Sequence, residues 1–195
     1  AQGTSSYRPA VATSALGMPV VRFDGSNDGL SFNMPINGLE GITIFLVGNN
    51  NSATQNGGTS IYDSPAICWT EFASWGYVFL SPFQTNVNWR FGTTVAQNNL
   101  HRYPRPASIG NKYTITTLMK NADVETLYID RSMAAQISDK NFPLAGVGDA
   151  AWLGRSPRSS SAWYNGDLLE VLVYTTALSD ADRQAVETYL HQKHL

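Results

Sequence analysis

Short apolar runs recur along the chain, and clusters of Gly, Asn, Asp and Ser separate them. Val, Ile, Thr and aromatic residues within a run favour half-buried strands, whereas the polar clusters favour turns. Because no helical segments alternate with these runs, the pattern predicts an all-β sandwich or barrel. The predicted strands are 19–23, 29–32, 42–47, 66–72, 77–80, 87–91, 113–119, 124–129 and 168–174.

The C-terminal segment has a different pattern, which predicts one amphipathic α-helix. Ser179 offers an N-cap hydroxyl, and Asp182 lies three residues later, as in a capping box. Lys193 and His194 lie in the last turn, where cations complement the helix dipole. Apolar residues at helical spacing indicate that the helix packs on its own domain through Ala181, Ala185, Val186, Tyr189 and Leu190.

Length and charge narrow the classes of partner. The 195 residues suit a single domain, in which 43% of residues are hydrophobic and only 14% are charged. The formal net charge of -2 gives no broad attraction to phosphate backbones or anionic lipids, and no apolar run approaches the ~20 residues of a membrane span. We therefore expect neither a nucleic-acid partner nor membrane insertion. Because the chain begins with Ala-Gln and has no initial Met, we expect a processed or excised fragment.

Two segments carry a resemblance to a known family. Residues 20–30 (VVRFDGSNDGL) and 165–179 (NGDLLEVLVYTTALS) resemble the opening and closing signatures of concanavalin A-like, laminin G-like jelly rolls. Residues 125–130 resemble the strand before a turn in that superfamily, and Arg131 stands where the family has Gly. The resemblance implies a single domain over 1–195, with a two-sheet antiparallel β-sandwich of the jelly-roll type and a short C-terminal α-helix. It also implies an extracellular or secreted protein.

Charged residues within these signatures have two interpretations. Asp24, Asn27 and Asp28 suit a turn between two strands, and their oxygens are also candidate calcium ligands. The spacing matches no dedicated calcium loop, so we favour the turn and expect no required cofactor, with calcium left open. Glu170 lies in an apolar strand, where a carboxylate must be hydrogen-bonded or paired, and Arg22 is our candidate partner.

Relatives of this fold include glycoside hydrolases and polysaccharide lyases, so we looked for catalytic carboxylates. A retaining pair projects from one sheet face at about 5 Å, which along a strand requires i, i+2 or i, i+4 spacing. Asp167 and Glu170 are three apart, so only a bulge would place them on one face. Asp123 and Glu125 have the right spacing, but a solvated strand entrance after Asn121 explains them. We found no catalytic motif of either enzyme class, and therefore predict a protein that is not an enzyme.

A ligand-binding face is predicted from strand alternation. Sugars stack on aromatic faces, and their hydroxyls bind amides, carboxylates and guanidinium groups. In 86–91, Asn88 and Arg90 point away from Trp89, and if Trp69 shares their sheet face, it provides a stacking platform. Core packing is the alternative for each aromatic residue, and a solvated surface is the alternative for each arginine. The predicted ligand-binding residues are Trp69, Glu71, Trp75, Tyr77, Asn88, Arg90, Tyr103 and Arg105.

Three functional hypotheses follow. The first is a noncatalytic carbohydrate-binding module that recognises a polysaccharide or oligosaccharide and belongs to a larger secreted protein, such as one with a catalytic domain. The second is a protein-binding adhesion or virion-type module on the same fold. The third is a small glycoside hydrolase or polysaccharide lyase. We favour the first hypothesis.

Overall fold

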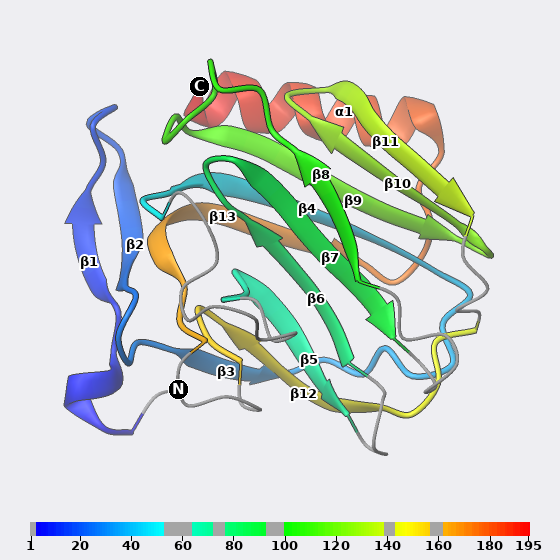
Figure 1. The fold of residues 1–195 in the computed structure, drawn as a ribbon, viewed down its shortest axis with the longest axis horizontal. Helices are drawn as coiled ribbons and strands as arrows, with labels where there is room; N and C mark the ends of the chain where they lie inside the picture. The colour runs from blue at the N-terminus through cyan, green and yellow to red at the C-terminus, as the bar shows by residue number, and fades with distance from the viewer. Residues whose placement is uncertain (1–2, 53–63, 72–76, 93–99, 139–142, 157–161) are drawn as a thin grey trace.

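The computed structural model describes residues 3–52, 64–71, 77–92, 100–138, 143–156 and 162–195. In this part of the chain, thirteen strands form two antiparallel sheets, and the helix α1 (Asp180–His194) follows the last strand (Figure 1). A short 3-10 helix, η1 (Ser5–Tyr7), precedes the first strand. The predicted class, an antiparallel β-sandwich with one C-terminal helix, is confirmed.

The two sheets contain strands that are distant in sequence. The seven-stranded sheet has the order β1 (Ala10–Thr13), β2 (Pro19–Asp24), β13 (Asn165–Tyr174), β4 (Gly41–Asn50), β9 (Thr114–Asn121), β10 (Val124–Ile129) and β11 (Ser132–Ser138). The six-stranded sheet has the order β3 (Leu30–Asn33), β12 (Val147–Leu153), β5 (Ile67–Glu71), β6 (Tyr77–Pro82), β7 (Asn86–Gly92) and β8 (His101–Pro104).

The main core lies between the two sheets, because alternate residues of the central strands point inward. The seven-stranded sheet contributes Ile44, Leu46 and Leu118, and the six-stranded sheet contributes Trp69, Val78 and Trp89. Each of these side chains has at most 1% of its surface exposed. Burial of this apolar surface is the main force that holds the two layers together.

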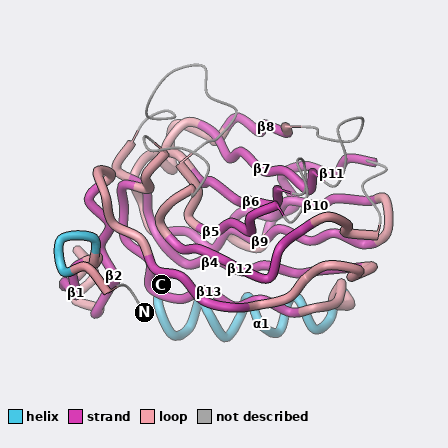
Figure 2. Tube along the Cα trace, turned by 90° about the horizontal axis from the view of Figure 1, so that it is seen from below, coloured by secondary structure: helices cyan, strands magenta, loops and turns pink. Residues whose placement is uncertain are grey.

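Helix α1 covers the outer face of the seven-stranded sheet, on the side away from β7 and β8 (Figure 2). Its N-cap forms as predicted, since the Ser179 hydroxyl accepts the Asp182 backbone N–H at 3.2 Å. Leu190 packs with Phe45, Val47 and other apolar residues of the sheet, so packing on the domain itself is confirmed. Within the described residues, no helix is long and apolar enough to cross a membrane.

The sheet-facing stripe of α1 differs from the apolar stripe that the spacing predicts. Ala181, Ala185 and Tyr189 are exposed, whereas Arg183 and Glu187 are buried. Their burial is compensated, because the two side chains pair and Glu187 also accepts a 2.7 Å hydrogen bond from the Thr117 hydroxyl of β9. The Arg183 guanidinium also lies 3.8 Å from the centre of the Tyr128 ring. Only Val186 and Leu190 of the predicted stripe pack inward.

Candidate functional site

Trp69 does not share a face with Asn88 and Arg90, so this part of the predicted ligand site is wrong. Trp69 pairs with Val78, which in turn pairs with Phe91, and this register places the indole inside the sandwich. The indole has no exposed surface, and its Nε1 donates a 2.9 Å hydrogen bond to the Met34 carbonyl. Trp69 is therefore a core residue and not a stacking platform.

Asn88 and Arg90 lie opposite the inward-pointing Trp89, as alternation predicts, but they are not open to solvent. Asn88 has no exposed surface, and only 3% of Arg90 is exposed. The Arg90 guanidinium lies 5.9 Å from the centre of the Phe79 ring, which belongs to a small buried cluster with Cys68 on this face. The predicted exposed amide and guanidinium face is therefore wrong.

The predicted rim at 103–106 also divides into separate parts. Arg105 is buried and donates hydrogen bonds to the Phe83 carbonyl at 2.6 Å and to the Thr114 hydroxyl at 3.0 Å. Burial lowers the pKa of Arg105. Its hydrogen bonds link its own segment to those that contain Phe83 and Thr114. Tyr103 is half-buried against the main core and lines a separate hollow of about 160 Å³.

Three further predicted ligand residues cannot be placed. Trp75 lies outside the described residues, and only the backbones of Glu71 and Tyr77 are described, in β5 and β6. Their part in ligand binding stays a prediction.

The segment 24–28 forms a turn supported by its own hydrogen bonds. The Asp24 backbone N–H donates to Asp28 Oδ2 at 2.9 Å, and Asp24 Oδ1 accepts the backbone N–H of Ser26 at 2.7 Å. Burial raises the pKa of the Asp28 carboxyl. Among the described residues, no group of three or more His, Cys, Asp or Glu side chains could hold a metal ion. The turn needs no ion to explain its geometry, and calcium binding stays an open expectation.

A β-bulge brings Asp167 and Glu170 to the same face of the seven-stranded sheet. Asp167 is opposite Asn49 and Glu170 is opposite Val47, so the three-residue spacing on β13 matches a two-residue spacing on β4. This is the bulge without which the three-residue spacing would have placed the two carboxylates on opposite faces. Sequence spacing could not reveal the bulge, because Leu169 has no feature that marks it as the extra residue.

Each of these two carboxylates has its own hydrogen-bonding partners. Arg22 donates to both oxygens of Asp167, from Nε at 2.7 Å and from Nη2 at 2.8 Å. Glu170 instead accepts hydrogen bonds from Lys193 at 2.9 Å and pairs with His194 at 2.6 Å. The predicted Glu170–Arg22 pair is therefore wrong, and Glu170 ties its strand to the last turn of α1.

The partners of Asp167 and Glu170 also set their ionisation. Burial alone would raise both pKa values, but the hydrogen bonds from Arg22 and Tyr113 lower the pKa of Asp167. Hydrogen bonds from His194 and Lys193 likewise lower the pKa of Glu170. A general acid needs a raised pKa, so neither carboxyl has the ionisation that an acid catalyst requires.

Glu125 is buried, so its interpretation as a solvated strand entrance is wrong, whereas Asp123 is exposed as expected. The Glu125 carboxylate accepts a 2.8 Å hydrogen bond from Trp89 Nε1 and lies 3.5 Å from the Lys120 ammonium. The His101 imidazole lies 3.8 Å from the same carboxylate. These contacts join the two sheets through a polar group inside the sandwich.

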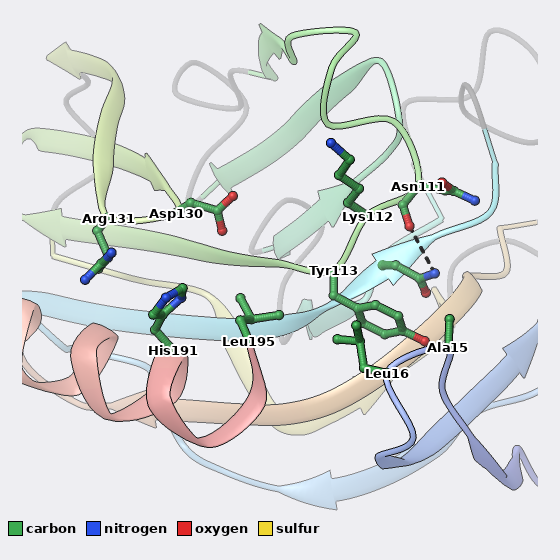
Figure 3. Close-up of a pocket in the computed structure, with 10 residues that line it drawn as sticks. Ala15, Leu16, Asn111, Lys112, Tyr113, Asp130, Arg131, His191 and Leu195 are labelled. Atoms are coloured by element: carbon green, nitrogen blue, oxygen red, sulfur yellow. Dashed lines mark hydrogen bonds between the residues drawn. The ribbon is translucent and has the colours of Figure 1, made fainter.

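The candidate functional site is a hollow of about 580 Å³ at the C-terminal end of α1. Five segments meet there: the β1–β2 turn, the end of β4, the segment before β9, the β10–β11 turn and the end of α1 (Figure 3). The lining residues are Ala15, Leu16, Asn49, Asn111, Lys112, Tyr113, Asp130, Arg131, His191 and Leu195.

Hydrogen bonds hold two polar residues of the hollow in place. Asn49 accepts the Asp167 backbone N–H at 3.0 Å and donates to the Asn111 carbonyl at 3.2 Å. The Tyr113 hydroxyl donates to Asp167 Oδ2 at 2.5 Å, and its pKa is raised to about 12 by burial and by this carboxylate. A binding surface whose side chains are already fixed loses little conformational entropy when a ligand arrives.

The β10–β11 turn has an unusual backbone. Asp130 and Arg131 form a two-residue hairpin loop with φ values of 46° and 70°. Such primed turns favour Asn and Gly, because a left-handed conformation costs an L-residue roughly 1–2 kcal/mol. Asp130 is held by its side chain, which accepts the Ile115 backbone N–H at 2.9 Å, whereas the exposed Arg131 lines the hollow.

Sequence reasoning missed every lining residue of this hollow as a site residue. The residues come from five separate segments, and no spacing rule predicts that these segments meet. One signal was present, because Arg131 stands at the turn position where the resembled family has Gly.

Comparison with family models found no match, and comparison with curated protein sequences found none either. Similarity is found among solved structures. The carbohydrate-binding module CBM40 of the Ruminococcus gnavus IT-sialidase, bound to α2,3 sialyllactose, has a TM-score of 0.65 and 16% identity. The match covers 86% of this chain and 95% of that chain.

Botulinum neurotoxin binding domains are also similar. The type C structure, which concerns cell entry dependent on two ganglioside molecules, has a TM-score of 0.64 and 10% identity over 93% of this chain and 44% of that chain. The type DC binding domain in complex with rat synaptotagmin II has a TM-score of 0.65 and 12% identity over 94% of this chain and 46% of that chain. The chain thus spans less than half of the toxin chains, and identities this low show the fold alone.

Proposed function

We propose that this chain is a noncatalytic carbohydrate-binding module and that the hollow at the end of α1 holds the glycan. The observation that carries the proposal is the composition of the hollow. Asn49 and Asn111 offer amides, Arg131 offers a guanidinium, and the half-buried Tyr113 offers an aromatic ring. Amides and guanidinium groups bind sugar hydroxyls, and aromatic rings stack on sugar faces.

The structural neighbours support a binding module. The sialidase module has α2,3 sialyllactose bound, and cell entry of the type C toxin depends on interaction with two ganglioside molecules. We propose that this chain also binds a glycan. Membership of the concanavalin A-like superfamily, an extracellular location and attachment to a larger protein belong to the same proposal.

The ionisable groups favour binding over hydrolysis. Among the described side chains that line the hollow, Asp130 is the one carboxylate, and its Oδ1 accepts the Ile115 backbone N–H. Asp167 and Glu170 lie on one sheet face, but hydrogen bonds from their partners lower both pKa values. A retaining or inverting mechanism needs two carboxyl groups with different ionisation.

A protein-binding module is the second candidate. Val11 and Leu16 of the β1–β2 hairpin have 86% and 52% of their surface exposed, and one toxin neighbour was solved in complex with rat synaptotagmin II. Exposed apolar residues on a hairpin can contact a protein partner. A glycan array separates this candidate from the first, because only the first predicts glycan binding.

Calorimetry on point variants tests the site. Wild-type protein should bind a glycan selected from the array with a Kd between micromolar and millimolar. This range corresponds to a binding free energy of about -8 to -4 kcal/mol. Tyr113→Ala should weaken binding at least tenfold, whereas Tyr7→Ala, an exposed aromatic residue outside the hollow, should leave Kd unchanged. Both variants must first show a cooperative melt.

Three results would contradict the proposal. Absence of binding to every glycan on the array would favour the protein-binding module. Loss of affinity in Tyr103→Ala, with none in Tyr113→Ala, would place the glycan site at the 103–106 segment. Release of reducing ends from the bound glycan would show that the protein is an enzyme.

A further inference from the structure

The geometry points to a glycan that carries a carboxylate, and we infer that Arg131 is the residue that selects it. This inference rests on the proposed glycan site and goes further by naming the chemical class of the ligand. Its starting point is a conflict at residue 131, where the backbone is left-handed at φ 70° but the residue is not Gly. A left-handed backbone at a residue other than Gly is a reason to ask what its side chain does there.

The hairpin itself does not need the Arg131 side chain. A two-residue turn of this type is most readily formed with Gly at its second position. The Arg131 side chain is exposed and lines the hollow, where it lies at the same end as His191 of α1 (Figure 3). The strain thus places a guanidinium at one end of the hollow, which a Gly turn could not do.

The charges of the lining side chains favour an anion. Lys112 and Arg131 are permanent cations, and the His191 imidazole adds a donor. Asp130 opposes them, but one of its oxygens is occupied by the Ile115 backbone N–H. Glu187 lies near Arg131 and is buried, and it is already bound to Arg183 and Thr117.

A carboxylated sugar fits this arrangement. The planar guanidinium can donate two parallel hydrogen bonds to a carboxylate, a geometry that a neutral hydroxyl does not offer. Tyr113 and Leu16 lie away from Arg131 along the hollow, where a sugar ring can pack (Figure 3). The anionic group of the ligand would then lie between Arg131 and His191.

The test compares each acidic glycan with its neutral counterpart. The probes are sialyllactose against lactose, and oligogalacturonate against its methyl ester. For at least one pair, wild-type protein should bind the acidic member at least tenfold more tightly, and added NaCl should weaken only that interaction. Arg131→Gly should abolish the preference.

The melting temperature of Arg131→Gly gives a second test, because Gly adopts the left-handed backbone conformation without strain. The variant should therefore melt at the same temperature as wild type or higher while it loses acidic-glycan affinity. Ala122→Gly is the matched control, since Ala122 has φ 51° in the β9–β10 turn, outside the hollow. It should gain stability in the same way and keep both affinities.

The outcomes separate this inference from the proposed function. Equal affinity for acidic and neutral members, or an unchanged preference in Arg131→Gly, overturns the selection by Arg131 while the glycan-binding proposal stands. Absence of binding to all four probes and to the wider array overturns both.

Discussion

Asp167 should be one of the most important polar residues for stability, because it ties β2, β13 and Tyr113 together. Its two oxygens accept three side-chain hydrogen bonds, two from Arg22 at 2.7 and 2.8 Å and one from Tyr113 at 2.5 Å. The Asp167 side chain is 2% exposed, but that of Arg22 is 45% exposed. Replacement by Ala would leave Tyr113 without its acceptor, while Arg22 could turn to water.

The cost of Asp167→Ala can be worked from these contacts. A hydrogen bond to a charged group contributes about 1.5–3 kcal/mol to stability. The sum over the three bonds is an upper bound, and we expect the variant to lose less free energy of unfolding than that sum. Because water can replace the carboxylate at Arg22, we expect a loss of about 3 kcal/mol in the free energy of unfolding. In a domain of this size, that loss lowers the melting temperature by about 6–12 °C.

Urea denaturation of wild type and variant measures this loss. Asp123→Ala is the matched control, since it removes the same charge from an exposed turn and should change the unfolding free energy by less than about 0.5 kcal/mol. A loss below about 1 kcal/mol in Asp167→Ala would refute the reasoning.

The same residue gives a pH prediction. Hydrogen bonds from Arg22 and Tyr113 outweigh the effect of burial and lower the folded-state pKa of Asp167 below its unfolded value. The ionised carboxylate therefore contributes its full stability above the unfolded pKa of about 3.9, and this contribution falls as pH drops through the folded pKa. The stability difference between wild type and Asp167→Ala should shrink below about pH 4. A difference that grows on acidification would contradict this sign.

Three further predictions concern other polar groups. Glu170→Gln should lower the free energy of unfolding by about 1 kcal/mol, because it weakens the contacts of β13 with His194, and an unchanged melting curve would contradict this role. Glu125→Ala should lower the free energy of unfolding by about 3–5 kcal/mol, because it leaves the buried Lys120 ammonium without its carboxylate. Urea denaturation measures this loss, and Glu125→Gln, which removes the charge but keeps the size of the side chain, is the control. Excess EDTA should leave the melting temperature unchanged, because backbone N–H groups of the 24–28 turn already donate hydrogen bonds to the Asp24 and Asp28 carboxylates. A fall of many degrees that calcium reverses would identify a calcium site.

The strands that were predicted and those that were missed differ in composition. All nine predicted runs overlap observed strands, because they are rich in β-branched and aromatic residues. The strands β1, β8, β11 and β12 were missed. Ser132–Ser138 and Val147–Leu153 contain Ala, Ser, Gly or Asp and take their conformation from neighbouring strands rather than from local propensity.

The predicted site failed for a different reason. Alternation correctly placed Asn88 and Arg90 opposite Trp89, but it could not show which face of β5 joins them. Pairing register decides that question, and it placed Trp69 inside. Alternation also reports only which residues share a face, whereas exposure depends on what covers that face.

The sequence by itself determined the class of fold, most of the strands and the capped C-terminal helix, because these depend on local propensity and periodicity. Only the tertiary structure decided how distant segments meet. The bulge at Leu169, the pairing of Arg22 with Asp167 and the hollow between α1 and the β10–β11 turn all depend on strand register and loop placement. Such contacts join residues far apart in sequence, and Arg22 and Asp167 are 145 positions apart, so local sequence carries no record of them.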